Sequence, residues 1–152
     1  MGLHLKRPGW LPPTSLVLCV LGLLDAAYLT YEHYSGSTSL ACSDTQLVNC
    51  TKVTTSQWSE LAGIPVALLG LLFFIAMTLL CLPVVWRRAP QLVQQIRLGA
   101  AAIGLLMVFY LVWAEFFKIH AICLWCTGVH VITFVLLIVL VLGEIFSHVE
   151  LD

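Results

Sequence analysis

Residues 120–146 read HAICLWCTGVHVITFVLLIVLVLGEIF and join two closely spaced cysteines to a long apolar run. A helix needs roughly 20 apolar residues to cross a hydrocarbon core of about 30 Å. The run therefore predicts a transmembrane helix that begins at Leu124. The pair at its start, Cys123 and Cys126, has three interpretations: a structural disulfide, part of a metal site, or a working redox pair.

The composition is that of a membrane protein. Of the 152 residues, 61% are hydrophobic and 10% are charged, and the mean hydropathy is +1.00. A soluble domain of this length does not need so apolar a chain to build its core. Seven basic residues stand against eight acidic ones, for a formal net charge of -1. Nucleic-acid binding requires a basic excess, so that class of partner is excluded.

The apolar pattern predicts an all-α membrane protein, a four-transmembrane-helix bundle. Its four spans are approximately residues 16–34, 64–86, 98–117 and 124–146. An even number of spans returns both termini to one side. Lys6 and Arg7 precede the first span, and Arg87, Arg88 and Arg97 bracket the link between the second and third. The positive-inside rule therefore places both termini in the cytoplasm.

One substantial outer loop, residues 35–63, joins the first two spans and is rich in Ser, Thr and Gly. Near its end Thr54 and Gln57 have the spacing of a capping box. We therefore expect a short helix that lies on the membrane surface and is anchored by Trp58. We find no linker or repeat, so residues 1–152 are expected to form a single transmembrane domain.

The six cysteines fall into two groups. Cys19 and Cys81 lie inside apolar spans and are interpreted as structural. The other four lie in the predicted extracytoplasmic layer, where disulfides persist. They are Cys42, Cys50, Cys123 and Cys126.

A redox relay accounts best for this second group. A static bridge across a Cys-x-x-Cys closes too small a loop to constrain the unfolded chain strongly. A zinc site is disfavoured because the gap between Cys42 and Cys50 is wide and an oxidising compartment opposes four stable thiolates. At a helix N-terminus, however, the helix dipole and unsatisfied N–H groups stabilise the Cys123 thiolate that disulfide exchange requires. We therefore expect a relay without metal, with a disulfide-stapled or zinc-binding protein as the alternatives.

Four segments of the chain together resemble the vitamin K epoxide reductase family, in its bacterial, disulfide-forming type. The resemblance is specific because three features occur together in a four-span protein. They are a spaced cysteine pair, a serine six residues after its second member, and a later Cys-x-x-Cys. DsbB-type oxidases carry their two cysteine pairs in the reverse order. The segments are GLLDAAYLTYEHY (22–34), CSDTQLVNCTKVTTSQW (42–58), GIPVALLG (63–70) and AEFFKIHAICLWC (114–126).

The resemblance implies a bundle around a membrane quinone, either ubiquinone or menaquinone. Carried onto matching positions, Cys42 and Cys50 form a shuttle pair, Cys123 exchanges with Cys50, and Cys126 reduces the quinone. Ser56 matches a loop Ser or Thr that family members place near the quinone head.

His130 is a second expected quinone contact. It follows Cys126 by four residues, so both project from one helical face, and it can donate to a quinone oxygen as negative charge develops there. Vertebrate members have a tyrosine at this position, which argues against vitamin K epoxide as the substrate. Two acidic residues inside spans are further candidates. We expect Asp25 to be protonated or bonded to a neighbouring helix, and Glu115 to reach water.

The expected function is a quinone-dependent thiol oxidase that generates disulfides. The chain ends soon after the fourth predicted span, whereas many bacterial relatives continue into a fused thioredoxin-like domain. The expected thiol partner is therefore a separate thioredoxin-fold (DsbA-like) protein. The expected location is a bacterial cytoplasmic membrane, with the active site on the extracytoplasmic side. A vitamin K quinone or epoxide reductase is the alternative activity.

Overall fold

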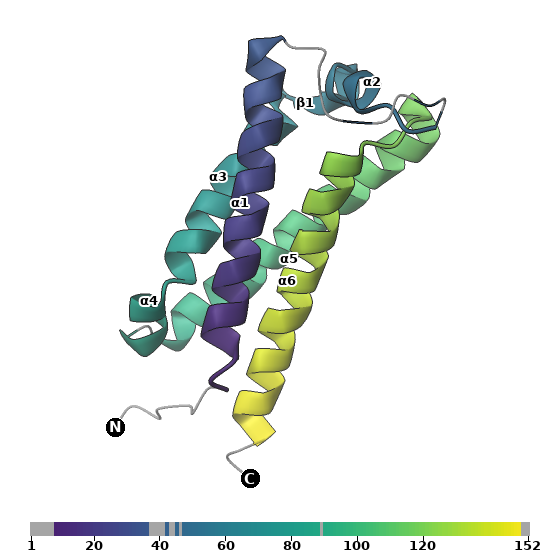
Figure 1. Ribbon diagram of the computed structural model, residues 1–152. Helices are drawn as coiled ribbons and strands as arrows, with labels where there is room; N and C mark the ends of the chain where they lie inside the picture. The colour runs from purple at the N-terminus through teal and green to yellow at the C-terminus, as the bar shows by residue number, and fades with distance from the viewer. Residues whose placement is uncertain (1–7, 37–41, 43–44, 46, 89, 150–152) are drawn as a thin grey trace.

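The computed structural model describes residues 8–36, 42, 45, 47–88 and 90–149. Four long helices run along one another, and shorter elements join them at both ends (Figure 1). The long helices are α1 (Leu11–Ser35), α3 (Val66–Leu80), α5 (Gln91–Ala114) and α6 (Leu124–Val149). The shorter elements are α2 (Cys50–Thr54), the 3-10 turn η1 (Gln57–Ser59), strands β1 (Glu60–Leu61) and β2 (Ile64–Pro65), α4 (Pro83–Arg88) and the π-helix η2 (Glu115–Ile119).

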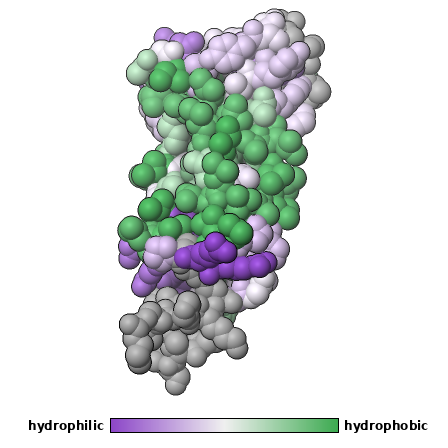
Figure 2. All heavy atoms as spheres, turned by 90° about the vertical axis from the view of Figure 1, so that its left-hand side faces the viewer, coloured by the Kyte–Doolittle hydropathy of each residue, from purple (hydrophilic) through white to green (hydrophobic). Residues whose placement is uncertain are grey.

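Within the described part of the chain, three helical segments are long and apolar enough to cross a membrane. They are Leu11–Ser35, Gln91–Ile119 and Leu124–Ser147. A band of apolar side chains covers the middle of the face drawn in Figure 2, with more polar residues at either end. Leucine, isoleucine and phenylalanine side chains remain exposed along these helices. The chain is therefore an integral membrane protein, because such a band is stable only against lipid.

The second predicted span is interrupted. The expected helix over residues 64–86 is two helices, since α3 ends at Leu80 and α4 begins at Pro83. Proline lacks the N–H group that a continuing helix requires, but it fits well at the start of a new one. The apolar helix α3 alone has 15 residues.

Arg97 contacts both helices at this interruption. We expected it to flank a cytoplasmic link, but its side chain is fully buried. Its Nε donates to the carbonyl oxygen of Leu80 at 3.0 Å, and its guanidinium stacks 3.6 Å from the ring centroid of Trp86. The arginine thereby satisfies a carbonyl that the end of α3 leaves without a helical partner.

The bundle core lies mainly where α1 packs against α3 and α6. Gly22 permits the close approach of α3, because a Cβ atom at this position would lie 2.2 Å from the buried Phe74 ring. In the interface between α1 and α6, a Cβ atom on Gly143 would lie 2.3 Å from Leu11. Glycine therefore sets the spacing at two points along α1.

The short loop helix begins earlier than the sequence predicts. Thr54 is the last residue of α2, not the start of a helix, and its hydroxyl donates to the carbonyl oxygen of Cys50 at 3.0 Å. The N-cap is Asn49, whose side-chain oxygen accepts the N–H of Lys52 at 2.8 Å. The prediction from the Thr54 and Gln57 spacing is therefore wrong, because Asn49 offers a cap five residues earlier.

Trp58, the expected surface anchor, lies in the single turn η1. Its ring is half-buried and meets the ring of Trp113 edge-on, with centroids 5.7 Å apart. The tryptophan therefore connects the loop to α5. After η1 in the chain, strands β1 and β2 form a two-stranded antiparallel hairpin that leads into α3.

Candidate active site

A backbone strap joins the loop to the segment that precedes α6. The N–H of Ile122 donates to the carbonyl oxygen of Leu47 at 2.8 Å, and the N–H of Asn49 donates to the carbonyl oxygen of Ile122 at 3.1 Å. Val48 and Ile122 form a parallel bridge between these bonds. The strap brings the residue before Cys50 alongside the residue before Cys123.

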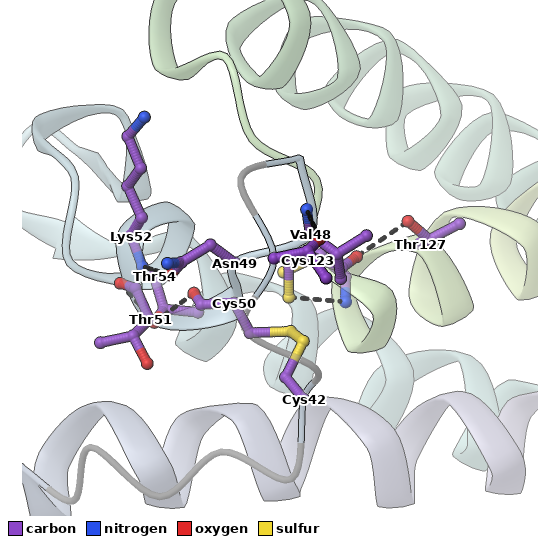
Figure 3. Close-up of a disulfide and its surroundings, with 11 residues drawn as sticks. Cys42, Val48, Asn49, Cys50, Thr51, Lys52, Thr54, Cys123 and Thr127 are labelled. Carbon is purple, nitrogen blue, oxygen red and sulfur yellow. Dashed lines mark hydrogen bonds between the residues drawn. A yellow bond between two sulfur atoms is a disulfide. The ribbon is translucent and has the colours of Figure 1, made fainter.

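The two cysteine pairs consequently lie in one apolar cluster. Cys42 and Cys50 form a disulfide with Cα atoms 6.0 Å apart, while Cys123 and Cys126 are free thiols. Cys50 and Cys123 are both fully buried, and Cys42 and Cys126 pack against the same cluster. In Figure 3 the disulfide and the Cys123 sulfur lie close together above α1. The structure thus unites all four predicted site cysteines.

Cys123 is the cysteine whose surroundings favour a thiolate. It directly precedes α6, and the N–H of Cys126 donates to its Sγ at 3.2 Å. The pKa of Cys123 is lowered from its ordinary value, first by the hydrogen bond from the Cys126 side chain and then by that backbone N–H. Burial and the nearby Glu115 carboxylate act in the opposite direction. The thiolate that attacks and leaves in disulfide exchange is therefore favoured at Cys123.

A pocket with about 690 Å³ of empty space, part of it open to the surroundings, adjoins the cysteines. Cys126 borders it from the first turn of α6. Most of its walls are apolar side chains of the bundle, including Leu29, Leu111 and Val129. A largely apolar pocket with a few polar groups is the usual form of a site for a small hydrophobic molecule.

Both predicted quinone contacts border this pocket. His130 lies one turn beyond Cys126 on α6 and is buried. Ser56 borders the pocket from the loop, directly before η1. Its hydroxyl donates to the carbonyl oxygen of Val53 at 2.8 Å, so that hydrogen must rotate away before it can serve a bound oxygen.

Glu115 also borders the pocket, and its expected contact with water is wrong. The side chain is only 4% exposed. At this residue the helix widens into η2, and His120 then adopts a left-handed conformation (φ 53°) that turns the chain back. The backbone N–H of Cys123 donates to the Glu115 carboxylate. An acidic residue inside an apolar span was the sequence signal for this site.

Two other polar residues lie near Cys126. His33 on α1 borders the pocket, although nothing in the sequence singled it out. Asp25 packs against α6, since a Cβ atom on Gly128 would lie 2.6 Å from its Oδ2. Its Oδ1 is buried and has no hydrogen-bond partner among the described residues.

The remaining two cysteines are remote from this pocket. Cys19 and Cys81 are fully buried in the core cluster of α1, α3 and α6, where their thiols are hydrogen-bonded to each other. Over the described residues, no group of three or more histidine, cysteine or acidic side chains is placed to hold a metal ion.

The fold and the site define an integral membrane protein with two adjoining cysteine pairs, one of which borders an apolar pocket. Residues 13–141 match the model of the vitamin K epoxide reductase family. The chain belongs to this family, whose members are membrane oxidoreductases that couple disulfide chemistry to quinones.

Proposed function

We propose that this protein is a quinone-dependent thiol oxidase that makes disulfides in other proteins. One observation carries the proposal. The strap at Ile122 places Cys50 beside Cys123 in one buried cluster, while Cys126 borders the pocket. Electrons can then pass from a thiol partner through the loop pair to the inner pair beside the pocket by two thiol–disulfide exchanges.

We further propose that the bundle spans a bacterial cytoplasmic membrane four times. Helix α3 is about 22 Å long at 1.5 Å per residue, so α4 and the turn before it supply the rest of the second span. The starting end of α1 and the finishing end of α6 lie together, opposite α2 (Figure 1). With Arg87 and Arg88 at the end of α4 in the cytoplasm, the cysteine pairs face the extracytoplasmic side. Residues 1–152 then form one transmembrane domain.

The first exchange begins with a separate thioredoxin-fold (DsbA-like) protein in its dithiol form. Its thiolate attacks Cys42, which is half-buried, whereas Cys50 is fully buried. The Cys42–Cys50 bond breaks, and the partner's second thiol displaces Cys42 as the partner's own disulfide closes. The partner leaves oxidised, and both loop cysteines are then thiols.

The second exchange passes the electrons inward. Cys50 attacks Cys123 of the oxidised Cys123–Cys126 pair, and Cys126 leaves as a thiolate beside the pocket. Cys42 then attacks Cys50, which restores the loop disulfide and leaves the inner pair as a dithiol. The observed structure, with a loop disulfide and two free inner thiols, corresponds to this state.

The pocket residues fit a quinone head group. The apolar walls suit its ring, His130 can donate to one oxygen, and Ser56 can serve the other after its hydroxyl rotates. Ubiquinone or menaquinone supplies, when bound, the two-electron acceptor that weakly reducing protein dithiols require. Cys126 is the cysteine that borders the pocket, so its sulfur is the one that would meet the quinone.

The test is reconstitution of the purified protein in lipid vesicles with added quinone. We expect oxidation of a reduced thioredoxin-fold protein at the expense of ubiquinone-1 or menadione, and loss of this activity in Cys126→Ser. Cys19→Ser, a buried change remote from the pocket, is the matched control and should remain active. A protein that binds stoichiometric zinc, or one that never oxidises the dithiol, contradicts the proposal. Vitamin K epoxide as the added oxidant tests the reductase alternative.

A further inference from the structure

Oxidation of the inner cysteine pair must move protons as well as electrons. If the proposed function holds, two S–H bonds break, one S–S bond forms, and two electrons with two protons reach the oxygens of the quinone. The walls around Cys126 are mostly apolar, and the side chains on them that can accept a proton are Glu115, His33 and His130. An ionisable side chain close to both sulfurs is therefore required.

Glu115 occupies such a position. Its carboxylate accepts a hydrogen bond from the backbone of Cys123 and lies close enough to interact electrostatically with both inner cysteines. It shares the pocket wall with Cys126 and is nearly fully buried. The π-helix that begins at Glu115 and the left-handed His120 hold it there.

Other ionisable groups lie around the pocket and the inner cysteines. Lys118, on the same element, lies over the Trp58 and Trp113 rings at 5.6 and 5.3 Å. The groups on packed elements are Cys123, Cys126 and His130 on or beside α6, and Asp25 and His33 on α1. Of the two carboxylates, Glu115 borders the pocket, whereas Asp25 packs against Gly128 behind it.

We propose that Glu115 is the proton carrier of the inner cysteine pair. Its carboxylate takes the proton of the Cys126 thiol as that sulfur attacks, and gives the proton to the reduced acceptor. As the Cys123–Cys126 bond forms, the carboxylate takes the second proton from the Cys123 thiol and passes it to the acceptor, so that it returns to the ionised form each time. The hydrogen bond from the Cys123 backbone keeps the carboxylate in place through both transfers.

A quinone-free experiment isolates this step. In a Cys19→Ala/Cys81→Ala background, the reduced inner pair reacts with 4,4′-dithiodipyridine, a small neutral disulfide. In the first phase Cys123 attacks the reagent and releases one thiopyridone. In the second phase Cys126 loses its proton, attacks the mixed disulfide at Cys123 and releases the other. The two phases are followed by absorbance as the inner disulfide closes.

Glu115→Gln retains an oxygen for the Cys123 backbone but cannot take a proton. We expect its second phase to slow by about 100-fold, the lower range for loss of a general base, with the first phase changed less than about threefold. Glu115→Asp keeps a carboxylate and should retain a second phase within about tenfold of the parent. Glu144→Gln makes the same chemical change far along α6 and should leave both phases unchanged.

Three results overturn the inference: an unchanged second phase in Glu115→Gln, equal slowing of both phases, or slowing in Asp25→Asn instead. If Glu115→Gln does not fold, the parent is measured in deuterated water. The second phase must then slow more than the first, and equal effects reject the carrier. Because no quinone or protein partner is present, this result is independent of the vesicle assay that tests the proposed function.

Discussion

Asn49 stabilises the helix that keeps the loop residue Cys50 buried. Its side chain caps α2 through the N–H of Lys52 at 2.8 Å, and Cys50 is the first residue of that helix. Cys50 is fully buried. A reagent can therefore reach a free Cys50 thiol only when this part of the loop opens.

The expected effect of Asn49→Ala follows from the single bond that it removes. Loss of an asparagine N-cap costs about 1 kcal/mol, while the strap bonds of the backbone at Leu47 and Ile122 remain. Because 1.4 kcal/mol corresponds to a factor of ten in a population, the open state should become about fivefold more populated. Labelling of Cys50 through local opening should accelerate by the same factor.

The assay uses Cys42→Ser, which leaves Cys50 as a thiol, with the protein kept reduced. Labelling by an impermeant maleimide is followed by mass spectrometry of the peptide that contains Cys50. Asn49→Asp retains a capping oxygen and is the conservative control. Thr55→Ala removes an exposed hydroxyl that donates to the Thr51 carbonyl at 2.8 Å, and it should leave the rate unchanged. Equal rates for Asn49→Ala and Asn49→Asp, or immediate labelling of Cys50 in the parent, refute the reasoning.

Three further predictions concern the exchange chemistry. In Cys42→Ser, a Cys50–Cys123 disulfide should accumulate and join the two halves of a chain cut near the α4–α5 link. Cys50→Ser should not join the two halves. If Cys50→Ser joins them and Cys42→Ser does not, the two shuttle roles are exchanged. Because its pKa is lowered, Cys123 of the reduced protein should be alkylated with a pH midpoint below the value of about 8.5 for a free cysteine. The rate should fall as the pH drops through that midpoint, and a midpoint at or above 8.5 contradicts the assignment. His130→Ala should lower kcat or raise KM for quinone by about tenfold or more and leave partner oxidation by a preformed Cys42–Cys50 disulfide intact; unchanged quinone kinetics make His130 structural.

The amino-acid sequence by itself determined the class and the family of this protein. Long apolar runs are a local property, so α1, α5 and α6 could be located from the sequence, although α1 and α5 begin at Leu11 and Gln91, before the predicted starts at residues 16 and 98. The spaced cysteines and the later Cys-x-x-Cys gave the family, which the match over residues 13–141 confirms. Pro83 was also visible in the sequence, but the buried role of Arg97 beside it was not.

The tertiary structure decided how these residues meet. The strap pairs Val48 with Ile122, two residues more than 70 positions apart, and no periodicity in the sequence reports such a pairing. Glu115 borders the pocket because the backbone widens at η2 and reverses at His120. Apolar patterns record which side chains avoid water, and they do not record which of them share one cavity. Backbone hydrogen bonds between distant segments, formed only in the folded chain, set that arrangement.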